Sequence, residues 1–457
     1  MEPEHIRFGG GAAETILHPL VLIWMLIAVA LILILPRHKV IVPFLLTFFT
    51  IPLPQVIVIS SVHFTVQRVI ILAGLGRLAF FRSTASERRF AGRFNALDWA
   101  VVLWTLSGFV VVSLQWLDAQ ALVKFLGDLL EGLGGYVVVR FLIPDHSTVR
   151  RTIKVLGAIC MIQGVCMVSE LFTHQNVFGF LGMSPPAIRE GHLRAMGVMG
   201  SLYGGPFAGV LIPMFLWLWT EPKSKLAACA GVTGASAMAI SSHASTSVTA
   251  LGAGLVGLGF WPLRKKMRLV RWGIVAILVA LHLIMKGPVW SLIEHVDLTG
   301  GSSGYHRYML IDTLIRHFSD WWLLGTRDNG SWGWEMWDTC NEFVATAVTG
   351  GLLTLILYIM ILKRSFAAIG NARNRISGDR NQEWFLWCLG SCLFANVVAQ
   401  FGINYMVQLL FLLSSLLACI SAASLESRRT LVEGRTGDKC LSHAPIPARE
   451  QFFQEAV

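Results

Sequence analysis

The chain has 457 residues, of which 54% are hydrophobic and 14% charged, and its formal net charge is +10. Soluble domains contain about 25% charged residues, so this composition excludes an ordinary soluble enzyme. The positive charge does not by itself indicate a nucleic-acid-binding protein, because membrane proteins retain lysine and arginine on their cytoplasmic side.

Apolar residues are grouped into runs of about 18–22, the length that a helix needs to cross a hydrocarbon core of roughly 30 Å. We expect these runs to be helices, because lipid offers the backbone no hydrogen-bond partners. No basic segment precedes the first run, so we expect a membrane helix there and not a cleavable signal peptide. We predict about thirteen spans, near residues 17–35, 41–60, 66–81, 98–116, 121–142, 153–172, 197–219, 226–241, 246–262, 271–287, 343–362, 383–401 and 404–424.

Basic residues mark one side of this predicted membrane. They fall in alternate loops, around residues 37–39, 82–93, 150–154, 223–225, 264–271, 363–380 and 428–429. With thirteen spans all of these loops lie on the same side, which the positive-inside rule makes cytoplasmic. The sequence therefore predicts a protein of the bacterial inner (plasma) membrane with an external N-terminus.

The predicted organisation is an all-α, polytopic integral membrane protein. Residues 1–287 contain ten transmembrane helices with a short external loop at 173–196, and residues 343–426 contain three more. Between them, residues 288–342 form a large periplasmic loop that we expect to fold as a helical cap. The polar segment 427–457 is expected to be a loosely ordered cytoplasmic tail. Charged residues in the external loops are not explained by topology, so they are candidates for function.

The first external loop carries three basic side chains directly before a glycine-rich entry into the membrane. They are Arg189, His192 and Arg194. A guanidinium group is a planar fork of donors that suits a phosphate or pyrophosphate at the membrane surface. The alternative is that these arginines extend to lipid head groups.

The second external loop begins with a Gly/Ser turn at 299–304 and continues with helical periodicity over 305–318. His306 and Arg307 stand at the beginning of this predicted helix. An aromatic, glycine-containing segment follows, in which Trp332 and Trp334 are candidates for binding a glycan. The alternative for this segment is an aromatic belt at the membrane interface.

Four polar residues stand where the chain re-enters the membrane: Asp338, Cys340, Asn341 and Glu342. Nine residues, Glu342 to Gly350, separate Asn341 from the sequence Gly-Leu-Leu-Thr at Gly351 to Thr354. This order of motifs resembles the O-antigen ligase and O-antigen polymerase superfamily. Ligases of that family place a histidine before the Asn-type residue, and this chain has Cys340 there.

The resemblance implies an integral-membrane glycosyltransferase that needs no metal and no cofactor. Such an enzyme transfers a glycan from a polyprenyl-pyrophosphate carrier to a sugar hydroxyl in surface polysaccharide assembly, as a polymerase or a ligase. By this likeness Arg194 and Arg307 bind the pyrophosphate. Fixed guanidinium groups would stabilise the charge that develops on this leaving group more than they stabilise the ground state.

The cysteine at the family's histidine position leaves three alternatives open. A thiol with a pKa near 8.5 is a poor general base for a sugar hydroxyl. His306, Asp338 or Glu342 could serve as the base, the protein could be a polymerase that tolerates the change, or activity could be lost. Cys340 stays among the candidate catalytic residues.

Further polar groups lie in or near the apolar runs. Arg68 could supply another phosphate contact, because it lies near the external end of its span. The small, polar stretch 241–254 favours close helix packing, and His243 within it favours a structural hydrogen-bonding role.

Two other functions stay open: a transporter or flippase for a lipid-linked oligosaccharide, and an inactive assembly component. A transporter would be expected to place charges near the bilayer midplane and to show an internal repeat. The concentration of charge in one external loop favours the enzyme. The expected partners are the lipid-linked donor, a glycan or lipid-linked acceptor and membrane lipids, and no nucleic acid.

Overall fold

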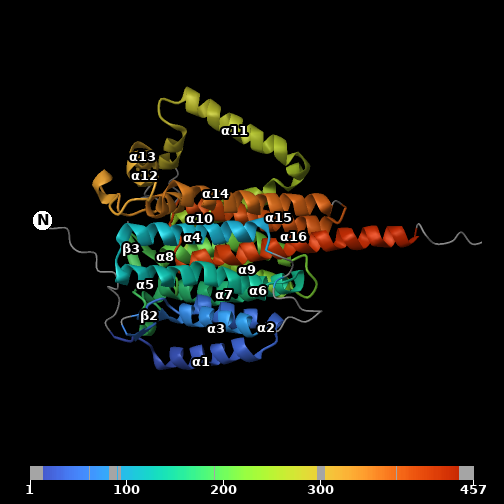
Figure 1. The fold of residues 1–457 in the computed structure, drawn as a ribbon, viewed down its shortest axis with the longest axis horizontal. Coiled ribbons are helices and arrows are strands. Elements are labelled where there is room, and N and C mark those ends of the chain that lie inside the picture. The colour runs from blue at the N-terminus through green and yellow to red at the C-terminus, as the bar shows by residue number, and fades with distance from the viewer. Residues whose placement is uncertain are drawn as a thin grey trace, which may run out of the picture.

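A computed structural model of the protein describes residues 14–60, 62–81, 90, 94–189, 191–295, 304–376 and 378–441. Long helices run back and forth along one common axis and form a bundle (Figure 1). In chain order its first half contains α1 (Pro19–Ile34), α2 (Arg37–Thr50), β1 (Val56–Ile59), β2 (Val62–Thr65), α3 (Val66–Phe80), α4 (Ala96–Trp116), α5 (Ala119–Leu129), the π-helical turn η1 (Leu130–Gly134), α6 (Gly135–Leu142) and α7 (His146–Thr173).

The second half begins with short elements and continues with helices. It contains η2 (Gly179–Leu181), β3 (Ala187–Arg189), β4 (His192–Arg194), α8 (Ser201–Leu218), α9 (Lys225–Ser241), α10 (Ser245–Gly259), η3 (Trp261–Lys266), α11 (Met267–Ile284), η4 (Val289–His295), α12 (Gly304–Arg316), α13 (Phe318–Trp321), η5 (Gly330–Trp332), α14 (Glu342–Arg375), α15 (Arg380–Gln400) and α16 (Val407–Leu441). Each of the predicted apolar segments therefore contains a helix.

Two of the predicted boundaries are wrong. Residues 56–60 were expected to be helical, but α2 ends at Thr50 and an antiparallel hairpin of β1 and β2 follows. Pro52 and Pro54 lack a backbone N–H and so disfavour continuation of the helix, and the β-branched residues after them favour strands. At the other end of the chain, the expected loose tail is helical as far as Leu441. The predicted turn at 299–304 lies outside the described residues except for Gly304.

The fold is mostly helical, with long apolar helices of the kind that cross membranes. Within the described residues, six helical segments have the length and composition to span a membrane: Ala96–Trp116, His146–Thr173, Ser201–Leu218, Trp261–Ile284, Glu342–Arg375 and Val407–Leu425. Three shorter apolar helices accompany them: Pro19–Ile34, Lys225–Ser241 and Ser245–Gly259.

The main core lies between the long helices, and small residues bring several of them close together. α8 lies in the middle of the packing and is almost entirely buried. A Cβ added at Gly164 on α7 would lie 2.7 Å from the carbonyl oxygen of Gly234 on α9. Between α9 and α10, the hydroxyls of Ser242 and Ser247 are 2.8 Å apart and lie against Gly205 of α8. The close packing predicted for 241–254 is confirmed.

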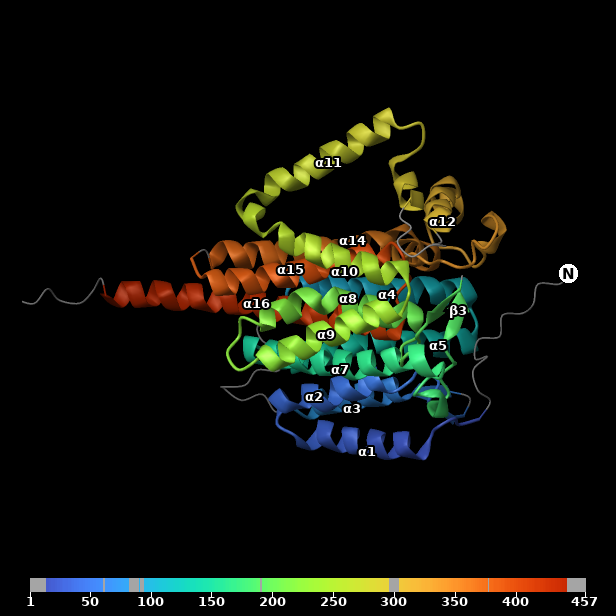
Figure 2. The same cartoon turned by 180° about the vertical axis from the view of Figure 1, so that it is seen from behind.

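One helix stands apart from the bundle. None of the residues of α11 is buried, and the views from both sides show it separated from the neighbouring helices (Figures 1 and 2). Short helical turns, η3 and η4, connect its two ends to the rest of the molecule.

The two ends of the bundle differ in character. The end that we call the α12 end carries α12, α13 and both strand hairpins, whereas α16 extends from the opposite end (Figure 1). At the opposite end basic loop residues pair with acidic ones, as Arg150 does with Glu221 and Arg264 does with Glu383 at 3.3 Å. The candidate functional residues lie at the α12 end.

Candidate functional site

Two arginines from separate loops lie near the junction of α9 and α10, where the Ala195 N–H that follows Arg194 donates to the Ser241 carbonyl at 3.0 Å. The Arg307 guanidinium, from α12, donates a hydrogen bond from Nη2 to the Thr246 hydroxyl at 3.2 Å. Three residues earlier lies His243, whose pKa is lowered by burial and, to a smaller extent, by the nearby charges of His192 and Arg194. The structure therefore brings Arg194 and Arg307, which are 113 positions apart (307 − 194), to one short segment.

Helix N-termini add to the positive field at this place. Thr246 lies in the first turn of α10, Arg307 lies in the first turn of α12, and Ser247 packs against Gly205 near the beginning of α8. None of these three helices has an acidic residue in its first turn. Because a helix N-terminus presents backbone N–H groups and a partial positive charge, the arrangement suits an anion.

A buried carboxylate holds the segment that follows Arg194. Glu170, on α7, is fully buried and accepts hydrogen bonds from the backbone N–H groups of Met196 at 2.6 Å and Gly197 at 2.9 Å. The next N–H group, of Val198, donates to Gln163 of the same helix at 3.2 Å. These bonds fix the chain between β4 and α8 and thereby the base of the Arg194 side chain.

The β3–β4 hairpin presents the remaining basic residues of the first external loop. Arg189 is exposed at its tip, and His192 stacks on His243 with ring centroids 5.4 Å apart and an interplanar angle of 10°. His243 has a positive φ of 42° at the turn between α9 and α10. The stacking and the turn give His243 structural contacts, and the hydrogen-bonding role expected of its side chain stays a prediction.

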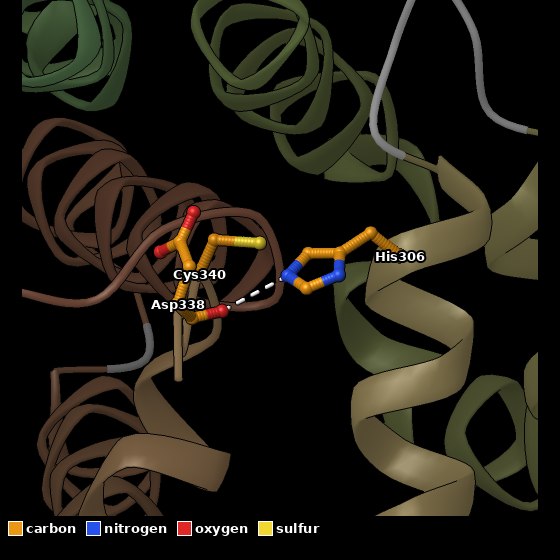
Figure 3. Close-up of side chains that lie close together, drawn as sticks. All are labelled: His306, Asp338 and Cys340. Atoms are coloured by element: carbon orange, nitrogen blue, oxygen red, sulfur yellow. Dashed lines mark hydrogen bonds between the residues drawn. The ribbon is translucent and has the colours of Figure 1, made fainter. Parts of the chain in front are cut away.

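The segment from Trp337 to Glu342 has two faces. Trp337, Thr339 and Glu342 line a cavity of ≈ 550 Å³. Asp338 and Cys340, which alternate with them, lie beside His306 of α12 (Figure 3). The segment thus separates the cavity from the cluster next to Arg307.

The cluster of His306, Asp338 and Cys340 is compact. One ligand atom from each side chain lies within 4.8 Å of the other two. His306 Nε2 is 2.9 Å from the backbone carbonyl oxygen of Asp338. A carbonyl oxygen only accepts, so Nε2 carries the hydrogen of this bond and Nδ1 of the neutral ring carries the lone pair.

The thiol of Cys340 is not activated as a base. Burial raises the pKa of Cys340 to about 11, although the neighbouring Arg307 guanidinium acts in the opposite direction. The thiol is therefore protonated at neutral pH. Of the candidate bases, His306 is partly buried and directed toward the Asp338–Cys340 segment, whereas the Asp338 carboxylate is exposed.

The next two residues have buried, structural contacts. Asn341 is fully buried, and its Oδ1 caps α14 by accepting from the N–H groups of Phe343 at 3.0 Å and Val344 at 3.3 Å. Glu342 accepts from the backbone N–H of Tyr405 at 2.6 Å and so anchors the chain between α15 and α16. The Nδ2 atom of Asn341 has no hydrogen-bond partner among the described residues, so the prediction that Asn341 binds a glycan now depends on that atom alone.

The cavity lies between α4, α5 and the outer part of α14. Its wall combines aromatic rings with polar side chains, a composition suited to a sugar ring or a lipid-linked head group. Its polar lining residues include Gln115, Lys124, Asp128, Arg327, Glu342 and Thr354, and its aromatic ones include Trp104, Trp116 and Trp337.

The glycine that the family resemblance singles out breaks α14. Gly351 has a φ of 71°, and a Cβ added there would lie 2.7 Å from the carbonyl oxygen of Leu323. After the break, the Leu352 N–H donates to the Trp322 carbonyl at 2.9 Å. A left-handed φ and this close approach together favour glycine. Thr354, one turn further, lines the cavity.

The other predicted contacts have different surroundings. Arg68 pairs with Glu131 at 2.7 Å and with Asp128 at 3.4 Å, which gives it a structural role in holding α3 to α5 and η1. Trp334 is 81% exposed, and its role as a glycan contact stays a prediction. Trp332 is half-buried and stacks on His317, with ring centroids 5.1 Å apart.

Sequence reasoning missed one residue of the site and the contacts of two others. Thr246 was part of a stretch assigned only to packing, and its contact with Arg307 spans 61 positions. Glu342 was a candidate base, but its bond to the Tyr405 N–H, like the bonds of Glu170 to Met196 and Gly197, follows only from tertiary structure.

Comparison with known proteins assigns no function, so the site is interpreted from its residues alone. No family model matches the sequence, and no curated protein matches it.

Proposed function

We propose that the protein is a membrane glycosyltransferase that moves a glycan from a polyprenyl-pyrophosphate carrier to a sugar hydroxyl. The observation that carries this proposal is that Arg194 and Arg307 both lie near the α9–α10 junction, close to the beginnings of α8, α10 and α12. Two guanidinium groups near helix N-termini suit a pyrophosphate, because they offer hydrogen-bond donors and positive charge to its several negative charges.

The same groups would promote departure of the carrier. Transfer forms a bond between the acceptor hydroxyl oxygen and the anomeric carbon, and it breaks the bond from that carbon to the pyrophosphate oxygen. The leaving pyrophosphate takes the electron pair and gains negative charge, which fixed cationic donors stabilise more than they stabilise the bound substrate.

His306 is the best-situated base for the acceptor hydroxyl. Its Nε2 is held by the Asp338 carbonyl, so its Nδ1 lone pair can take the hydroxyl proton. This assignment gives an answer to the problem posed by Cys340, whose thiol is protonated at neutral pH. Glu342 lies across the segment, in the wall of the cavity, where it holds Tyr405.

The proposed membrane arrangement follows the sequence pattern. The helices alternate in direction, and the described basic loops, such as 37–39 and 223–225, lie at the end opposite α12 (Figure 1). This supports a bacterial inner-membrane protein with thirteen crossings whose residues 288–342 cap the outer, periplasmic end. The acceptor and donor glycans would then meet outside the membrane, next to the exposed Trp334.

The proposal is tested by glycan transfer with purified protein in liposomes that contain a lipid-linked oligosaccharide. Native protein is compared with Arg194→Ala and Arg307→Ala, and Arg316→Ala is the matched control because it lies on the same helix and is exposed. Losing one fixed donor to a developing oxyanion costs about 10²–10³ in rate, so we expect that loss in both site variants and a native rate in the control.

Two results would contradict the proposal. One is movement of the intact lipid across the bilayer without any change of its glycan, which would indicate the transporter. The other is native transfer by both site variants, which would place the chemistry elsewhere in the molecule.

A further inference from the structure

The structure assigns a second property to the cluster next to Arg307: we infer that His306, Asp338 and Cys340 form a binding site for a soft divalent metal ion such as Zn²⁺. The three ligand atoms come from two parts of the chain and lie within 4.8 Å of one another (Figure 3). The family resemblance implies no metal, so this inference departs from the expectation drawn from the sequence.

The donor set selects the class of metal. An imidazole nitrogen, a thiolate sulfur and a carboxylate oxygen are the three ligand types that proteins use for Zn²⁺. A thiolate is a poor ligand for Mg²⁺ or Ca²⁺, which prefer oxygen. Three protein ligands leave a fourth position open in a tetrahedral site, as in zinc sites that exchange a bound ligand.

The geometry needs only a small adjustment. Zinc bonds of 2.0–2.3 Å put tetrahedral ligand atoms about 3.3–3.6 Å apart. Asp338 is exposed and can close this difference by rotation of its side chain. The ring edge of His306 that carries Nε2 already faces the Asp338–Cys340 segment (Figure 3). Metal binding through Nε2 moves the ring hydrogen to Nδ1 and replaces the bond to the Asp338 carbonyl, so His306 cannot act as the proposed base while the metal is bound.

The charge balance is compatible with the neighbouring arginine. Cys340 binds a metal as a thiolate and releases its proton to solvent, and Asp338 is a carboxylate. Two anionic ligands neutralise the 2+ charge of the ion. Arg307 therefore faces a centre that carries no additional net positive charge, and its guanidinium favours the thiolate form.

Cobalt provides a spectroscopic test on the complete purified protein. Protein stripped with a chelator is titrated with Co²⁺ alone, and a bound thiolate gives a sulfur-to-cobalt charge-transfer absorption. We expect this absorption to saturate at one Co²⁺ per chain and to disappear when Zn²⁺ is added. It should be absent from Cys340→Ala, and His306→Ala should bind Co²⁺ at least about tenfold more weakly.

Cys229→Ala is the matched control, because Cys229 is an exposed cysteine on α9 with no place in the cluster. This control should keep the native absorption. The inference is overturned if native protein shows no charge-transfer absorption or if the absorption persists in Cys340→Ala.

A second measurement needs no variant and so does not depend on folding of the mutants. Maleimide labelling of native protein is followed by mass spectrometry, with and without Zn²⁺. Zinc should slow labelling of Cys340 at least about tenfold and leave Cys229 unchanged. Equal labelling of Cys340 in both conditions would contradict the site. Neither experiment contains a glycan donor, so the outcome is independent of the proposed transfer activity.

Discussion

Arg68 and Arg307 are both arginines at the α12 end of the bundle, but their surroundings differ. Arg68 is placed between two carboxylates, Glu131 at 2.7 Å and Asp128 at 3.4 Å. Arg307 instead contacts the hydroxyl of Thr246 and the thiol of Cys340. The carboxylates around Arg68 give it the role of holding helices together, whereas the helix N-termini beside Arg307 provide a setting suited to an anionic ligand.

The contrast also corrects the role of Arg68. Its position near the outer end of the predicted span led to the prediction of a phosphate contact, because an ionisable residue within a membrane span is costly unless it has a function or a partner. The partners are on α5 and η1, 60 and 63 residues away, and no local pattern indicates them. Position along a helix therefore does not distinguish a structural arginine from a ligand-binding one.

The largest expected effect separates the two arginines by activity. Arg307→Met should reduce glycan transfer by about 10²–10³, because the fixed donor to the pyrophosphate is lost. Its thermal stability should stay close to native. The measurement pairs initial transfer rates in liposomes with thermal unfolding of the same preparation, and a large loss of stability in this variant would remove the distinction.

Arg68→Met should show the reverse behaviour. Removing one member of a mostly buried ion pair leaves Glu131 without its partner and should cost about 3 kcal/mol of unfolding free energy. Unfolding in mixed micelles measures this, and the double variant Arg68→Met with Glu131→Met should recover most of the loss. Native stability of Arg68→Met would show that the ion pair has no structural role.

A smaller effect concerns the hydroxyl that contacts Arg307. Thr246→Val keeps the shape of the side chain but removes its hydrogen bonds to Arg307 at 3.2 Å and to the Gly402 carbonyl at 3.2 Å. At about 1 kcal/mol for one such bond, transfer should fall about fivefold. Ser147→Ala, at an exposed position of α7, provides a control, and an unchanged rate in Thr246→Val would mean that Thr246 does not position Arg307.

The smallest effect is a dependence on pH. His243 has its pKa lowered in the folded protein, so folding favours its neutral form. The unfolded chain therefore binds more protons just below the usual value of about 6.5, and stability should fall as the pH drops from there through the lower pKa. His243→Asn, which tolerates the positive φ, should flatten this dependence of the melting temperature. Arg194→Ala should weaken it, and an unchanged profile in both variants would show that the charges of this junction do not reach His243.

The sequence predicts the helices better than it predicts their contacts. Apolar runs of spanning length indicate a helix in each segment. In lipid the backbone N–H and C=O groups find hydrogen-bond partners only within the helix itself, so local composition is enough for this prediction. The exception, β1 and β2, follows prolines that the length criterion ignored. The same limitation applies at the site: Arg307 was identifiable, but the nearness of Cys340 to His306 depends on how residues 321–337 fold between them.

α11 is isolated from the other helices, so we expect the surrounding lipid to be its main neighbour. No side chain of α11 is buried by protein, so neighbouring helices do not fix its tilt, and we expect the thickness of a host bilayer to influence it. α11 is followed by η4, which packs against α12, the helix that carries His306 and Arg307. We therefore expect the position of these two residues to respond to the acyl-chain length of the host membrane. Bilayer thickness is then a physical variable of the site, and detergent is a poor substitute for a bilayer.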